Sequence, residues 1–214
     1  ALGFNVDFAP VADVLTNPDN QVIGQRSFGS DAQTVAGMVT AELQGLSAAG
    51  VYGMVKHFPG HGGTSGDSHD GAVSTDKTLE ELMAEELVPF QSAIDGGVNF
   101  VMVGHISAPN VTGDNAPATL SKVLITDVLR GQMGYNGIVI TDAMNMEAIT
   151  GFYNSDKAAV LAVTAGADMI LMPADYNTAY TGILNAVNDG TITEERINES
   201  VTRIVKAKLA MGQP

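Results

Sequence analysis

The chain has 214 residues, of which 45% are hydrophobic and 16% are charged, a balance typical of one globular domain with a sizeable core. Acidic residues outnumber basic ones by 24 to 10, and the net charge of −14 disfavours nucleic acid as a partner. No apolar run approaches the roughly 18 residues of a membrane span, and the absence of cysteine excludes disulfides, thiolate nucleophiles and cysteine metal sites.

Five short apolar runs alternate with longer helical patterns along the chain. Each run is rich in Val, Ile, Phe or Met and is followed by polar, Gly or Pro residues, which is typical of strands buried on both faces of a parallel sheet. The expected strands are Phe4–Ala9, Gly53–His57, Asn99–Gly104, Gly137–Thr141 and Asp168–Met172. This alternation predicts a parallel α/β fold, and by itself it leaves a doubly wound sheet and a (β/α)8 barrel both open.

Capping patterns predict where several helices begin. Ser30 with Gln33, and Thr78 with Glu81, each place a hydroxyl three residues before a side chain that can complete a capping box. The second pattern is interrupted by Pro89, where we expect the helix to break. Further helix starts are predicted at Ser121, Ser155 and Thr193, and helix ends at Gly50, Gly166, Gly190 and Gly212.

The densest chemistry lies directly after the second strand, in the Gly-rich run K-H-F-P-G-H-G-G-T-S-G-D-S-H-D from Lys56 to Asp70. Its glycines predict a long mobile loop. Asp67 and His69 are two residues apart, so in an extended stretch their side chains leave the same face. A carboxylate beside an imidazole fixes its tautomer and stabilises the imidazolium, which favours a proton donor near neutral pH.

Other interpretations of this loop remain open on the residues alone. His57, His61 and His69 with Asp67 could hold a divalent metal, although their spacing matches no zinc signature. The glycines resemble a phosphate cradle, but the spacing matches neither nucleotide-binding motif. The plainest alternative is a solvated loop whose histidines only form structural hydrogen bonds.

A second candidate, Asp142, follows the apolar strand Gly137–Thr141. It is expected either to cap a short helix or to face the same mouth as the histidine loop, since ligand sites lie beyond the carboxyl ends of parallel strands. A carboxylate paired with a proton donor suits nucleophile and acid chemistry at an acetal carbon. Arg26 is a candidate ligand-binding residue, with a structural ion pair as the alternative. His105 is expected to be packed and hydrogen-bonded, and Asp13 to anchor its own loop.

These motifs together resemble one known family. The run from Lys56 to His69 is similar to the K-H-F-P-G-H-G…D-S-H signature of bacterial β-N-acetylhexosaminidases in glycoside hydrolase family three. F-A-P-V-A-D-V at 8–14, the run 23–29 and Thr141-Asp142 match the same family in order. The resemblance implies a (β/α)8 TIM barrel, with residues 1–214 as the C-terminal part of a single barrel domain. By that comparison the chain is a truncated piece that carries the last five strands and lacks the first three.

Carried over by position, the resemblance implies a catalytic set. Asp142 matches the nucleophile, His69 the general acid/base and Asp67 its carboxylate partner. The positions that match sugar-binding residues are Arg26, Lys56 and His57. Two departures from the family pattern are Gly63, where an acidic residue is common, and Ala143, where an Asp often follows the nucleophile.

The activity implied is a retaining exo-hydrolase that removes terminal β-linked N-acetylglucosamine from peptidoglycan or chitin fragments, with no cofactor and no metal. A neutral imidazole as the base would repel phosphate less than a carboxylate would, so phosphorolysis of the same bond is an alternative. A metal-dependent hydrolase using the histidine cluster is another. The third is a non-catalytic sugar-binding fragment, and missing strands would also favour self-association through exposed strand edges.

Overall fold

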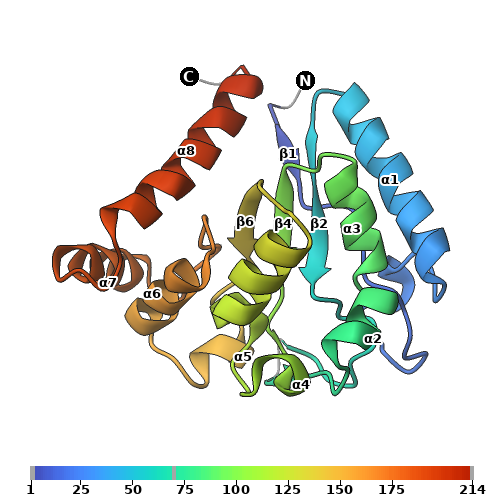
Figure 1. Cartoon of the computed structure of the whole chain (residues 1–214), viewed down its shortest axis with the longest axis horizontal. Helices are drawn as coiled ribbons and strands as arrows, with labels where there is room; N and C mark the ends of the chain where they lie inside the picture. The colour runs from blue at the N-terminus through green and yellow to red at the C-terminus, as the bar shows by residue number, and fades with distance from the viewer. Residues whose placement is uncertain (1–2, 69–70, 213–214) are drawn as a thin grey trace.

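Four parallel strands form the centre of the computed structural model, which describes residues 3–68 and 71–212 (Figure 1). They lie in the order β1–β2–β4–β6, with bounds Val6–Asp7, Tyr52–Phe58, Phe100–Val103 and Ile138–Thr141. A separate pair of short parallel strands, β3 (Val73–Ser74) and β5 (Ile106–Ser107), lies beyond the carboxyl ends of β2 and β4 in the chain.

Helices follow most strands, as predicted for a parallel α/β fold. The α-helices are α1 (Ala32–Ala48), α2 (Leu79–Ala84), α3 (Val88–Asp95), α4 (Pro109–Thr112), α5 (Glu147–Thr150), α6 (Ser155–Ala165), α7 (Tyr176–Asn188) and α8 (Glu194–Ala210). Two 3₁₀ turns, η1 (Gly24–Arg26) and η2 (Ala118–Leu120), and a π-helical segment, η3 (Val123–Gln132), complete the set. Among the described residues no helix combines the length and apolarity needed to cross a membrane.

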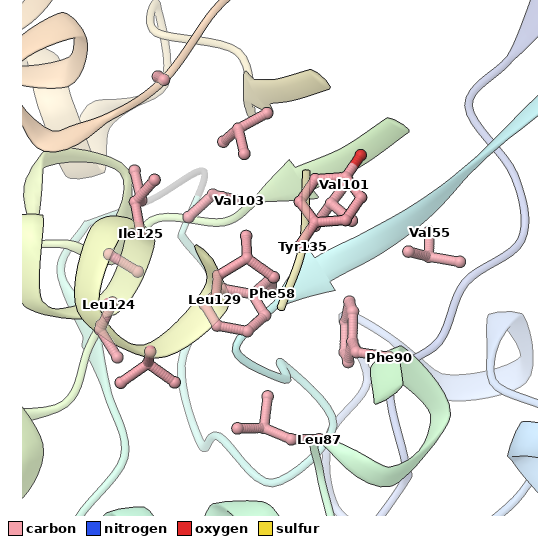
Figure 2. Packing of buried hydrophobic residues seen from close by; sticks show 14 of the residues in the cluster. Val55, Phe58, Leu87, Phe90, Val101, Val103, Leu124, Ile125, Leu129 and Tyr135 are labelled. Carbon is pink, nitrogen blue, oxygen red and sulfur yellow. The ribbon is translucent and has the colours of Figure 1, made fainter. Parts of the chain in front are cut away.

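The central strands are apolar on both faces because each face packs against its own cluster. In β4, Val101 and Val103 belong to the cluster under α1, α3 and η3, while Phe100 and Met102 face a second cluster that includes Ala207 of α8. Such alternation follows from the two-residue repeat of a strand. Figure 2 shows part of the first cluster, with labelled members Val55, Phe58, Leu87, Phe90, Leu124, Ile125, Leu129 and Tyr135 around the β4 valines.

The strand predicted at Asp168–Met172 is wrong: this segment makes only one isolated bridge, between Ile140 and Met169. Side chains supply further hydrogen bonds beside this bridge. The Asp168 carboxylate accepts the Val139 N–H at 3.0 Å, and the Thr141 hydroxyl oxygen accepts the Leu171 N–H at 3.0 Å. The segment still runs beside β6, where the Met169 N–H donates to the Val139 carbonyl at 3.1 Å and the Thr141 N–H to the Met169 carbonyl at 3.1 Å, but the pairing does not extend into a strand. The first strand, predicted at Phe4–Ala9, is shortened to Val6–Asp7.

Asp168 is also the centre of a buried ion cluster below β6. Its carboxylate is fully buried and accepts from Arg130 at 2.6 Å, from Arg203 at 3.0 Å and from the Ser200 hydroxyl at 2.6 Å. Burial opposes ionisation, but the arginine charges and hydrogen bonds outweigh it and hold the pKa of Asp168 below its ordinary value of 3.8. The cluster therefore ties η3 and α8 to the sheet.

The predicted caps are partly confirmed. Thr78 and Glu81 form the expected capping box at the start of α2, and Thr193 caps α8. The first helix is capped by Asp31 rather than Ser30, because the Asp31 carboxylate accepts the Thr34 N–H at 2.8 Å. The break expected at Pro89 falls just before it, between α2 and α3.

Candidate active site

The sequence-predicted residues gather where the parallel strands end. Lys56 and His57 directly precede Phe58, the last residue of β2. Asp142 directly follows β6, and Arg26 ends η1 in the loop that follows β1. Figure 1 shows β2 pointing toward the end of the molecule where α2, α4 and α5 lie. This is the edge at which α/β folds of this kind bind ligands.

Asp13 organises the start of the histidine loop. Its side chain is fully buried, and its Oδ2 lies 2.7 Å from Nδ1 of His57. The same carboxylate accepts the backbone N–H of His57 at 3.2 Å and that of His61 at 2.6 Å. Burial opposes ionisation, yet the charge and hydrogen bond of His57 keep the pKa of Asp13 below 3.8. Asp13 thus anchors the loop after β2 rather than its own loop, contrary to expectation.

The rest of the loop is held by buried polar contacts. His61 is 3% exposed; its Nδ1 lies 2.8 Å from the Thr64 hydroxyl and its Nε2 lies 3.3 Å from that of Ser68. Burial lowers the pKa of His61 below 6.5, which favours the neutral imidazole. Gly62 packs so closely that a Cβ there would lie 1.9 Å from the Val14 carbonyl oxygen. The first half of the loop is therefore fixed, and His61 is held within it by buried hydrogen bonds.

Lys56 places charge beside Asp142. Burial, followed by the positive charge of Arg26, lowers the pKa of Lys56 below 10.5, while the negative charges of Asp142 and Asp13 act in the opposite direction. These interactions indicate that Lys56, Arg26 and Asp142 share one electrostatic environment. The Arg26 guanidinium is exposed and donates to the Val22 carbonyl at 2.8 Å. The site therefore combines two cationic side chains with one carboxylate.

Asp142 is held by backbone groups. Its N–H donates to the Val103 carbonyl at 2.8 Å, which joins it to β4, and its Oδ1 accepts the Ala143 N–H at 2.8 Å. The helix-capping alternative is wrong, because α5 begins at Glu147 and its N-cap is Met146. The Asp142 carboxylate thus lies at the end of β6 and does not cap a helix.

The remaining predicted residues are placed as follows. Asp67 is half-buried in the loop between β2 and β3, and the general acid/base candidate His69 lies outside the described residues. His105 is 1% exposed, and both of its ring nitrogens lie within hydrogen-bond distance of polar atoms, as expected. Within residues 3–68 and 71–212, no group of three or more His, Cys, Asp or Glu side chains is arranged to hold a metal ion.

Sequence reasoning underestimated Asp13 and His105 at this edge. Asp13 and His57 are 44 positions apart, and the pairing of β1 with β2, continued by the bridge between Val11 and Lys56, brings them together. The signal present was a polar residue inside the apolar run F-A-P-V-A-D-V. His105 contacts the backbone of Ala143, next to Asp142, a relation that no spacing in the chain could reveal.

Comparison with known proteins gives a consistent family assignment. The model of the glycosyl hydrolase family 3 N-terminal domain matches residues 1–207. β-Hexosaminidase LpqI of Mycobacterium bovis is 39% identical over 215 residues, which cover 97% of this chain and 55% of that protein. The solved structure of a glycoside hydrolase family 3 β-N-acetylglucosaminidase from Paenibacillus sp. str. FPU-7 is 44% identical with a TM-score of 0.96, over 99% of this chain and 41% of that one.

A third similar structure differs in its named activity. A β-glucoside phosphorylase, BglX, is 30% identical with a TM-score of 0.94, over 98% of this chain and 40% of that one. The chain thus spans about half or less of the length of the proteins it matches. The TIM-barrel type of α/β fold predicted from the sequence is confirmed by these likenesses.

Proposed function

Since the chain belongs to the N-terminal domain family of glycosyl hydrolase family 3, we propose that it forms the catalytic edge of a retaining β-N-acetylhexosaminidase. The substrate would be a peptidoglycan or chitin fragment with a terminal β-linked N-acetylglucosamine. The observation that carries the proposal is the placement of Asp142 at the end of β6, beside the Lys56 and Arg26 charges. The relatives named β-hexosaminidase and β-N-acetylglucosaminidase support the choice of sugar.

In the proposed first step, Asp142 attacks the anomeric carbon while the bond to the leaving oxygen breaks. Because Oδ1 accepts the Ala143 N–H, we assign the attack to Oδ2. The leaving oxygen takes a proton from the His69 imidazolium, whose charge Asp67 would stabilise. In the second step a water gives its proton to neutral His69 and its oxygen to the anomeric carbon, which releases Asp142. Two displacements retain the configuration of the sugar.

Arg26, Lys56 and His57 are proposed to hold the sugar. Lys56 and Arg26 also place positive charge in the electrostatic environment of the proposed nucleophile, Asp142. Asp13 would act on this function indirectly, since its hydrogen bonds fix the His57 ring and the loop that begins there.

The test compares aryl β-N-acetylglucosaminides with good and poor leaving groups, using the complete protein that carries this chain. Asp142→Asn is expected to abolish turnover of both. His69→Ala is expected to slow the poor leaving group more, because only that group needs the proton. Asp127→Asn, at an exposed position in η3, is the matched control and keeps full activity. Equal losses on both substrates in His69→Ala would contradict the assigned acid role.

Phosphorolysis is a second candidate, favoured by the likeness to a β-glucoside phosphorylase. A neutral imidazole in place of a second carboxylate would let a phosphate dianion approach the glycosyl-enzyme with less repulsion. Phosphate oxygen would then replace water at the anomeric carbon. Product analysis in phosphate buffer distinguishes the two: N-acetylglucosamine 1-phosphate supports phosphorolysis, and free N-acetylglucosamine alone removes it.

A further inference from the structure

His105 is a buried histidine beyond the end of β4 to which the proposed mechanism gives no role. Its side chain is 1% exposed, and the neighbouring Thr119 is fully buried. Nδ1 of His105 lies 2.8 Å from the Thr119 hydroxyl, and Nε2 lies 2.9 Å from the carbonyl oxygen of Ala143. Buried polar contacts of this kind are made at fixed geometry, because a broken one leaves unsatisfied groups.

The chemistry of these groups sets the direction of the hydrogen bonds. A carbonyl oxygen can only accept, so Nε2 of His105 must carry a proton and donate to Ala143. In the neutral imidazole Nδ1 is then an acceptor, and the Thr119 hydroxyl can donate to it. Thr119 therefore favours the tautomer of His105 that holds the Ala143 carbonyl.

Ala143 connects this contact to the nucleophile. Its own N–H donates to Oδ1 of Asp142 at 2.8 Å. The next residue is also fixed, since the Met144 N–H donates to the Leu171 carbonyl at 2.9 Å. The peptide group after Ala143 is thus held by His105, through the Ala143 carbonyl. The peptide group before Ala143 is held through its N–H by the Asp142 carboxylate. A displacement of the Ala143 backbone would move the N–H that orients that carboxylate.

We propose that His105 is a positioning residue: its hydrogen bond fixes the Ala143 backbone and thereby orients the Asp142 carboxylate toward the anomeric carbon. The inference rests on the proposed role of Asp142 and adds a support that the family signature around the nucleophile does not contain. At the position after Asp142, where the resemblance leads us to expect an acidic side chain, the chain has Ala143. Here a histidine from the neighbouring strand, acting on the main chain, provides support.

The test measures formation of the glycosyl-enzyme from 2,4-dinitrophenyl β-N-acetylglucosaminide in single turnovers, because this leaving group needs no proton. His105→Phe keeps a buried ring but has no N–H, and we expect the rate constant to fall by about 10²-fold, the effect of a misplacement near 1 Å. His105→Gln retains an N–H donor and is expected to recover about tenfold of that loss, a smaller misplacement on the same scale. The inhibition constant of N-acetylglucosamine is expected to stay within about twofold in both variants, since sugar binding is not altered.

A purely structural role predicts a different pattern. If His105→Phe and His105→Gln lose the same activity, or if the inhibition constant rises in step with the loss of rate, the proposal is overturned. Thr119→Val keeps the side-chain shape but removes the hydroxyl, and a smaller rate loss that is not additive with His105→Phe is expected, as for partners in one network.

A readout independent of activity separates this inference from the proposed function. The ¹⁵N spectrum of the histidine-labelled protein is expected to show His105 with a protonated Nε2 and an unprotonated Nδ1, assigned by its loss in His105→Gln. The opposite tautomer would overturn the inference even if the enzyme is active. If the unmodified protein leaves the aryl substrate untouched, the proposed function fails first, and the positioning role fails with it.

Discussion

The buried Asp13 carboxylate gives the sharpest stability test in the molecule. Asp13→Asn keeps the size of the side chain but removes its charge and replaces one acceptor oxygen with an NH₂ group. Three donors converge on this carboxylate: His57 Nδ1 and the backbone N–H groups of His57 and His61. The new NH₂ group would face at least one of them. Removing one member of a buried charged pair costs about 3–5 kcal/mol, and we expect a loss of unfolding free energy in this range.

The pH dependence of the loss follows from the pKa direction. The pKa of Asp13 is lower in the folded protein than its ordinary value of 3.8. The stabilisation is therefore fully present above that value and is lost as the pH falls through the lower, folded-state pKa. The difference between the unmodified protein and Asp13→Asn is thus expected to be constant near neutral pH and to shrink in acid.

Urea unfolding followed by circular dichroism at neutral and acidic pH measures this difference. Asp31→Asn is the matched control, because Asp31 is an exposed helix cap and Asn caps nearly as well. A loss below about 1 kcal/mol for Asp13→Asn, the range of an ordinary exposed pair, would refute the reasoning. So would a difference that persists unchanged in strong acid.

Three further substitutions test other parts of the structure. Asp168→Asn leaves Arg130 and its partners without their buried counter-charge, so chemical denaturation is expected to show a loss of about 3–5 kcal/mol. Turnover by the folded fraction should be unchanged, because this cluster lies away from the strand ends that carry the site. Gly62→Ala forces a Cβ against the Val14 carbonyl oxygen, and thermal unfolding should show a loss of about 1–3 kcal/mol. Gly37→Ala in α1 meets no neighbouring atom and should instead stabilise by about 0.5–1 kcal/mol; equal effects of the two alanines would contradict the packing argument.

The fold was predictable where local pattern and tertiary packing agree. The strands around Val55, Val101 and Val139 are mostly apolar because both faces are covered, and each was expected near its observed bounds. The Asp168–Met172 segment has a similar composition, yet its backbone pairing with β6 is limited to one bridge, beside which side chains form further hydrogen bonds. Propensity does not distinguish these two outcomes, because the deciding partner lies on another element.

The candidate site was predictable to the level of strand ends and no further. Parallel strands gather the residues that follow them, which correctly placed Asp142, Lys56 and Arg26 at one edge. The contacts that fix the edge run between residues distant in the chain, such as Asp13 with His57. Composition and spacing carry no information about such pairs, so their roles emerge only from the structure.

The alternation of the central strands has a consequence for how the chain can vary in length. Adding or removing one residue inside β4 would exchange the side chains that face the two apolar clusters along the rest of that strand. In the turns beyond Val103 and Thr141, side chains do not alternate between two packed faces. These turns can therefore lengthen or shorten while the layers stay intact. Indels, and with them changes in ligand preference among homologous sequences, should therefore concentrate in those turns.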